Sequence, residues 1–101
     1  MLTTTEKREE AEKIARVLVE ERLAGCVQII GPITSTYWWE ESINTTEEWL
    51  LLIKSRKTLY PKIEETIKKN HSYKTPEIIM TPIITGDKDY LDWLNQELRE
   101  E

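Results

Sequence analysis

The chain has 101 residues and a mass of 12.0 kDa, which predicts a single domain over residues 1–101. A net charge of −5 disfavours nucleic acid and anionic membrane surfaces as partners, and one cysteine excludes a disulfide within the chain. The longest apolar run, residues 49–53, is far shorter than the roughly 20 residues of a membrane-spanning helix. Because the first residues also lack the features of a signal peptide, we expect a cytoplasmic protein with no membrane partner.

Residues 1–5 lean toward β structure, and residues 6–23 predict the first helix. From Ala11 onward, apolar residues recur at the i, i+3, i+4 and i+7 spacing that lines one helix face. One of the threonines near the N-terminus is predicted to cap the start of this helix. Gly25 is predicted to end it, because glycine tolerates a left-handed turn.

Residues 26–39 are rich in β-branched and aromatic side chains and predict a long strand. Gly31-Pro32 interrupts this strand, which predicts a bulge or an edge position. Residues 41–44 are predicted to form a turn, and residues 45–55 to form the returning strand. Because this strand carries apolar residues on both faces, both sides of its sheet should be covered.

Residues 58–70 predict a second helix, residues 71–76 a loop, and residues 77–85 a strand that Pro82 interrupts. A third helix should begin after Gly86, with Asp87 as its capping residue. Its inward side is predicted to hold Tyr90, Leu91, Leu94 and Leu98.

The order β-α-β-β-α-β with a C-terminal helix predicts an α+β fold of the ferredoxin-like type, with helices on one face of an antiparallel sheet. The apolar residues on the other face then predict burial of that face in an oligomer.

Several function classes are disfavoured by the residues. This acidic chain without phenylalanine lacks the basic and aromatic pattern of an RNA-recognition module, and it lacks the glycine-rich loop that nucleotide binding would require. No nucleophile and base pair is evident, so we do not expect an enzyme.

A few side chains leave two interpretations open. His71, the only histidine, is either hydrogen-bonded to the end of the preceding helix or a metal ligand. Cys26 is either a small buried side chain or a reactive or ligating thiol. Lys54 either extends its ammonium to water or holds an anion, and the clustered aromatic residues either pack in an interface or stack on a ligand.

Five stretches together resemble the divalent-cation tolerance (CutA) family over nearly the whole chain. They are residues 20–26 (EERLAGC), 34–40 (TSTYWWE), 52–55 (LIKS), 71–77 (HSYKTPE) and 86–94 (GDKDYLDWL). The resemblance implies a ferredoxin-like subunit in a homotrimer, whose long second and third strands reach neighbouring subunits and pair with their sheets. It implies a role in the response to divalent metal ions such as copper. The similar architecture of PII signalling proteins provides an alternative, a trimer that senses a small anionic ligand at its subunit clefts.

In members of this family that bind metal, the resemblance places one ligand at His71. The other two ligand positions are Thr3 and Asn70 here, which predicts weak copper binding. Glu41 replaces a glycine that is usual in the family. The cleft between subunits is expected to be lined by Cys26, Tyr37, Trp39, Lys54, Tyr73 and Glu77. Its ligand, and any protein partner beyond the trimer, are not identified by the sequence.

Overall fold

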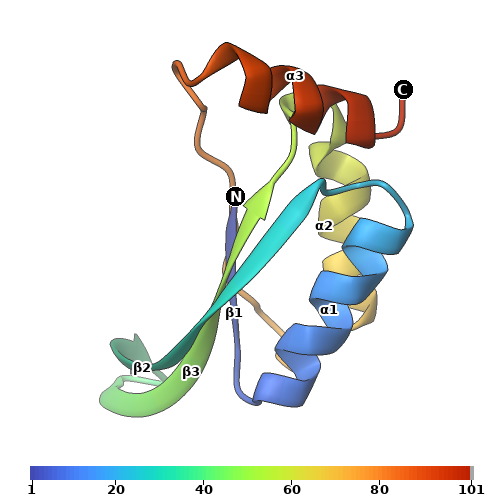
Figure 1. Ribbon diagram of the computed structural model, residues 1–101. Helices are drawn as coiled ribbons and strands as arrows, with labels where there is room; N and C mark the ends of the chain where they lie inside the picture. The colour runs from blue at the N-terminus through green and yellow to red at the C-terminus, as the bar shows by residue number, and fades with distance from the viewer. Residues whose placement is uncertain (101) are drawn as a thin grey trace.

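A computed structural model describes residues 1–100, which form one antiparallel sheet and three α-helices (Figure 1). In chain order the elements are β1 (Leu2–Thr5), α1 (Arg8–Glu20), β2 (Cys26–Trp39), β3 (Ser42–Lys54), the 3₁₀ helix η1 (Lys57–Leu59), α2 (Tyr60–Lys69), β4 (Ile78–Ile79) and α3 (Lys88–Glu97). The strand order is β2-β3-β1-β4, with every neighbouring pair antiparallel. This is the predicted ferredoxin-like arrangement.

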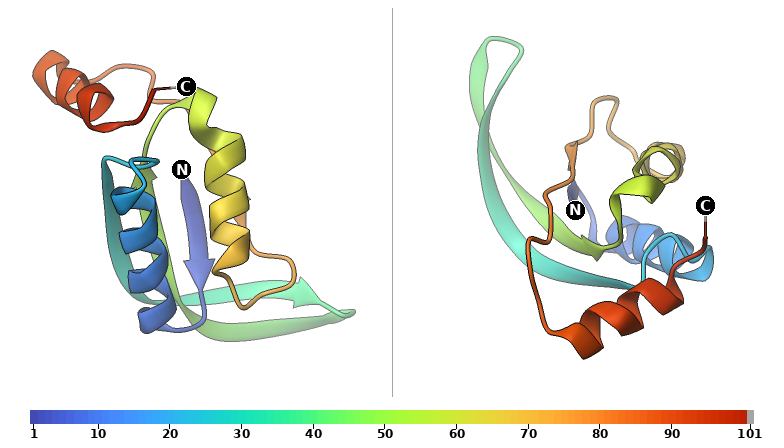
Figure 2. Two further views of the ribbon diagram at one scale, coloured as in Figure 1. Left: turned by 90° about the vertical axis from the view of Figure 1, so that its right-hand side faces the viewer. Right: turned by 90° about the horizontal axis from the view of Figure 1, so that it is seen from above.

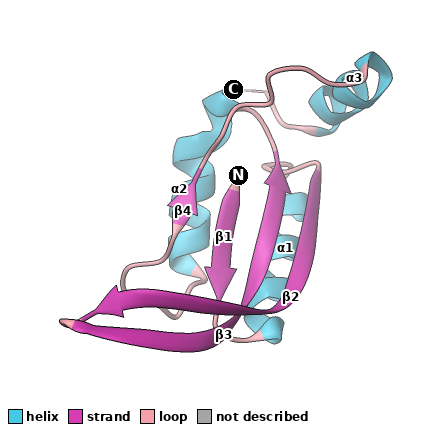
Figure 3. Cartoon of the chain, turned by 90° about the vertical axis from the view of Figure 1, so that its left-hand side faces the viewer, coloured by secondary structure: helices cyan, strands magenta, loops and turns pink. Residues whose placement is uncertain are grey.

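Helices α1 and α2 lie side by side over one face of the sheet, and α3 lies across one end (Figures 1 and 2). Alternate residues of β3 point toward the two helices, and they form the core together with the apolar faces of α1 and α2. The largest fully buried of these side chains are Ile14, Leu18, Leu51, Ile53, Ile63 and Ile67. The opposite face, seen toward the viewer in Figure 3, has neither α1 nor α2 over it, and we call it the open face. Among the described residues, no helix is long and apolar enough to cross a membrane.

The β2–β3 hairpin extends far beyond the rest of the sheet, which makes the molecule 45 × 26 × 21 Å in extent (Figure 2). β1 pairs only with residues 49–52 of β3, so the outer half of the hairpin has no third strand beside it. A register shift between Ile30 and Ile33 confirms the predicted bulge. Gly31 is needed there, because a Cβ atom on it would overlap the Trp49 ring.

The hairpin turn is shorter than the predicted 41–44 turn. Trp39 pairs with Ser42, which leaves Glu40 and Glu41 as a two-residue loop. Their φ angles are 50° and 64°, the left-handed conformation that matches the twist of hairpin strands and usually selects glycine or asparagine. Glu41 thus occupies a backbone conformation that glycine adopts with less strain.

Both predicted ends of the first helix are wrong in detail. No side chain of residues 1–100 caps its N-terminus, and the Thr5 hydroxyl instead donates to the Lys7 carbonyl at 2.9 Å. After the helix, Arg22 rather than Gly25 takes the left-handed conformation, with φ of 56°. Gly25 leaves room for Leu94 instead, since a Cβ atom there would lie 2.6 Å from Leu94 Cδ1 and the leucine side chain would have to shift. Its small size allows α3 to approach the sheet.

The strand predicted over residues 77–85 is mostly absent, because only Ile78 and Ile79 pair with β1. Pro82 has no backbone N–H to donate, and residues 80–85 have no ladder partner within the described chain. The predicted cap of α3 is confirmed, since Asp87 Oδ2 accepts a hydrogen bond from the Tyr90 N–H at 3.0 Å. Tyr90 itself is exposed, contrary to the prediction, while Leu94 and Leu98 are buried.

Candidate functional site

Four of the six predicted cleft residues lie on the open face. Cross-strand partners share a face, and β3 runs without a bulge, so its even-numbered residues all point to the open side. Cys26 pairs with Lys54, Tyr37 with Asn44 and Trp39 with Ser42, which places all three β2 residues on that side. Glu77 is exposed just before β4, and Tyr73 reaches the open face from the loop that follows α2.

The open face has two polar ends separated by apolar residues. At one end the Lys54 ammonium donates to Gln28 Oε1, beside the half-buried thiol of Cys26. Glu48 marks the other end, six residues away along β3 and therefore about 20 Å distant. Leu50 and Leu52 lie between them. Within one chain, Lys54 is therefore too far from Tyr37, Trp39 and Tyr73 to share a small ligand with them.

Glu48 is the central side chain of the second end, and the sequence did not single it out. It is only 6% exposed, and its Oε2 accepts a hydrogen bond from the Tyr73 hydroxyl at 2.8 Å. Burial, followed by the hydrogen bond and negative charge of Glu48, raises the pKa of Tyr73, so its phenol stays protonated at neutral pH. Tyr37 lies on the same side, with its hydroxyl 3.3 Å from Thr46 Oγ1.

His71 is held by hydrogen bonds at both ring nitrogens. Its Nδ1 lies 3.1 Å from the Tyr73 backbone nitrogen, and its Nε2 lies 2.6 Å from the Thr4 carbonyl oxygen. Because an amide N–H only donates, Nδ1 must be the acceptor, so the proton is on Nε2 and is donated to Thr4. The histidine therefore joins the loop to β1, rather than to the carbonyls at the end of α2.

One chain does not provide a closed metal site around His71. Residues 1–100 contain no group of three histidine, cysteine, aspartate or glutamate side chains placed to hold an ion. Thr3 is fully buried and its Oγ1 has no hydrogen-bond partner in the described part of the chain, whereas Asn70 Nδ2 donates to the Thr66 carbonyl at 2.9 Å. Metal binding at His71 would need ligands from elsewhere and the release of one ring nitrogen.

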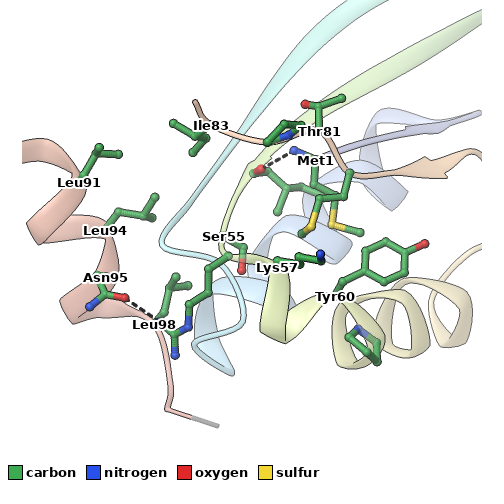
Figure 4. A pocket seen from close by; sticks show the side chains of 15 residues that line it. Met1, Ser55, Lys57, Tyr60, Thr81, Ile83, Leu91, Leu94, Asn95 and Leu98 are labelled. Carbon is green, nitrogen blue, oxygen red and sulfur yellow. Dashed lines mark hydrogen bonds between the residues drawn. The ribbon is translucent and has the colours of Figure 1, made fainter. Parts of the chain in front are cut away.

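A separate cavity of about 930 Å³ lies between α2, α3 and the segment after β4 (Figure 4). Its wall is largely apolar, with Met1, Tyr60, Ile83 and Leu94 among the lining side chains. Arg56 Nη1 donates to Asn95 Oδ1 at 3.0 Å and so helps to hold α3 over it. None of the predicted site residues lines this cavity, so we place the candidate site on the open face.

Comparison with known proteins agrees with this fold. Residues 1–97 match the family described as CutA1 divalent ion tolerance protein. The divalent-cation tolerance protein CutA of Thermus thermophilus is 44% identical over 96 residues, which cover 95% of this chain and 93% of that protein. The corresponding protein of Archaeoglobus fulgidus is 42% identical over 87% of this chain and 85% of its own length.

Solved structures show the same similarity in three dimensions. The divalent cation tolerance protein of Thermus thermophilus superimposes with a TM-score of 0.95 at 43% identity, covering 97% of this chain and 95% of that one. CutA1 from Oryza sativa gives a TM-score of 0.96 at 40% identity, covering 99% and 92%. The chain therefore belongs to the CutA1 divalent ion tolerance family.

Proposed function

We propose that this protein acts in divalent-cation tolerance as a cytoplasmic, non-enzymatic homotrimer that binds copper weakly through His71. The observation that carries the role is the family match over residues 1–97. The names of related proteins include chloroplastic and periplasmic forms, so the location stays a prediction. The PII-like alternative receives no support from the comparisons, and we set it aside.

Exposed apolar surface supports assembly of several copies. On the open face, Ile30 and Ile79 are each 46% exposed. At the hairpin tip, Trp38 is 71% and Ile43 is 64% exposed. A hairpin arm without a third strand, and residues 80–85 without a ladder partner in the described chain, present backbone groups that a neighbouring chain can pair with. Burying this surface between copies would remove it from water.

His71 can bind a metal only after one of its present hydrogen bonds is broken. The bond from the Tyr73 N–H to Nδ1 is the longer of the two, at 3.1 Å, so we take Nδ1 as the ligand atom. A trimer would contain three such imidazoles, one from each chain. The lost hydrogen bond opposes binding, which fits a weak site.

Calorimetric titration with Cu²⁺ tests this assignment. We expect His71→Ala to weaken copper binding by about tenfold or more, because imidazole is a preferred ligand for this metal. Ser72→Ala is the matched control, because it loosens the same loop by removing the bond from Ser72 Oγ to Glu10 but keeps the imidazole. If His71→Ala and the wild type titrate alike, the ligand assignment is wrong.

A further inference from the structure

Glu48 is a buried carboxylate that has no opposite charge beside it. Among residues 1–100, no lysine, arginine or histidine nitrogen lies within ion-pair distance of it. Its one hydrogen bond comes from the neutral phenol of Tyr73, to Oε2. Oε1 has no hydrogen-bond partner in this part of the chain, yet it is not sealed from solvent. One oxygen is thus available to a ligand.

The surroundings of Glu48 favour a cation. A carboxylate that has lost most of its water is destabilised unless a positive charge or several donors compensate. Tyr73 supplies one donor, and Glu6 adds a second negative charge close enough to raise the pKa of the Tyr73 phenol further. The net charge of −5 also draws cations toward the protein surface.

The ligands available argue for an organic cation rather than a bare metal ion. A divalent ion requires four to eight donor atoms, and residues 1–100 offer no group of three metal-ligating side chains. An aromatic ring, by contrast, is available on this side of the hairpin. Tyr37 shares the open face with Glu48 and is exposed, and its hydroxyl lies 3.3 Å from Oγ1 of Thr46, two residues from Glu48 along β3. Aromatic faces attract alkylammonium and guanidinium groups.

We propose that Glu48, oriented by Tyr73, forms a binding point for a positively charged organic nitrogen on the open face. The nitrogen donates to Glu48 Oε1, and its alkyl part contacts the ring of Tyr37. Two sources carry this chemistry, a free small-molecule amine and a lysine or arginine side chain of another copy of the chain. This site does not depend on metal binding at His71.

Calorimetric titration with n-butylammonium chloride, at ionic strength fixed with sodium chloride, tests the first source. Wild type should bind saturably, and Glu48→Gln should bind at least about tenfold more weakly, because the amide still accepts from Tyr73 but carries no charge. Glu47→Gln is the matched control, since Glu47 loses the same charge at an exposed neighbouring position. It should bind as wild type does.

Sizing chromatography of the same three proteins tests the second source. If the nitrogen belongs to another copy, Glu48→Gln should lower the particle size at micromolar concentration, while Glu47→Gln should not. The proposal is overturned if Glu48→Gln matches Glu47→Gln in both experiments. If Glu48→Gln does not fold, the wild type alone is measured. The proposal is also overturned if n-butylammonium and sodium change the thermal midpoint of the wild type equally and n-butylammonium does not dissociate its particle.

Discussion

The hydrogen bond between Tyr73 and Glu48 joins the loop after α2 to the open face. Because the folded state raises the pKa of the Tyr73 phenol, it holds this proton more tightly than the unfolded chain does. The stability that this proton confers is therefore fully present below about pH 10, the ordinary pKa of tyrosine in an unfolded chain. It is lost as the pH rises further.

Urea unfolding at increasing alkaline pH checks this expectation. The wild type should lose free energy of unfolding above about pH 10, and Tyr73→Phe should lose less. Tyr60 also has a raised pKa, from burial and from its hydrogen bond to Glu64, so some pH dependence should remain in the variant. Identical alkaline profiles for the two proteins would contradict the placement of Tyr73.

At the scale of the elements, the hairpin turn contains the clearest local strain. Glu41 has φ of 64°, where a non-glycine residue is disfavoured by roughly 1–2 kcal/mol. We expect Glu41→Gly to raise the free energy of unfolding by about 1 kcal/mol, after allowing for the flexibility of glycine in the unfolded chain. Chemical denaturation measures this difference.

Glu20→Gly is a suitable comparison, because Glu20 is exposed at the last position of α1. Glycine lowers stability there by removing a good helix former. If glycine raises the free energy of unfolding at position 41 and lowers it at position 20, the gain comes from relief of the left-handed conformation. Destabilisation at both positions would show that the turn does not carry this strain.

Element order and core faces could be predicted from the sequence because they depend on local periodicity. The apolar spacing from Ala11 onward predicts the buried face of the first helix, and the two-sided apolar strand at 49–53 predicts a sheet that is covered on both faces. The ends of elements were less predictable. Arg22, rather than Gly25, takes the left-handed turn, and most of the 77–85 segment lacks its pairing partner within the chain.

At the scale of the whole molecule, the site was only partly predictable. Cys26, Tyr37, Trp39 and Lys54 do share the open face, but Lys54 lies at its far end. Glu48 gave no sequence signal, because a glutamate before an apolar run is usually exposed, and its burial depends on a loop 25 residues later in the chain. Such contacts follow from tertiary packing rather than from local pattern.

We infer that this chain functions through surfaces that several copies complete. Light scattering behind a sizing column, at micromolar protein concentration, measures the number of copies in the particle. We expect a trimer of about 36 kDa, three times the 12.0 kDa of one chain. A stable 12.0 kDa monomer, with its open face and hairpin tip in water, would contradict it.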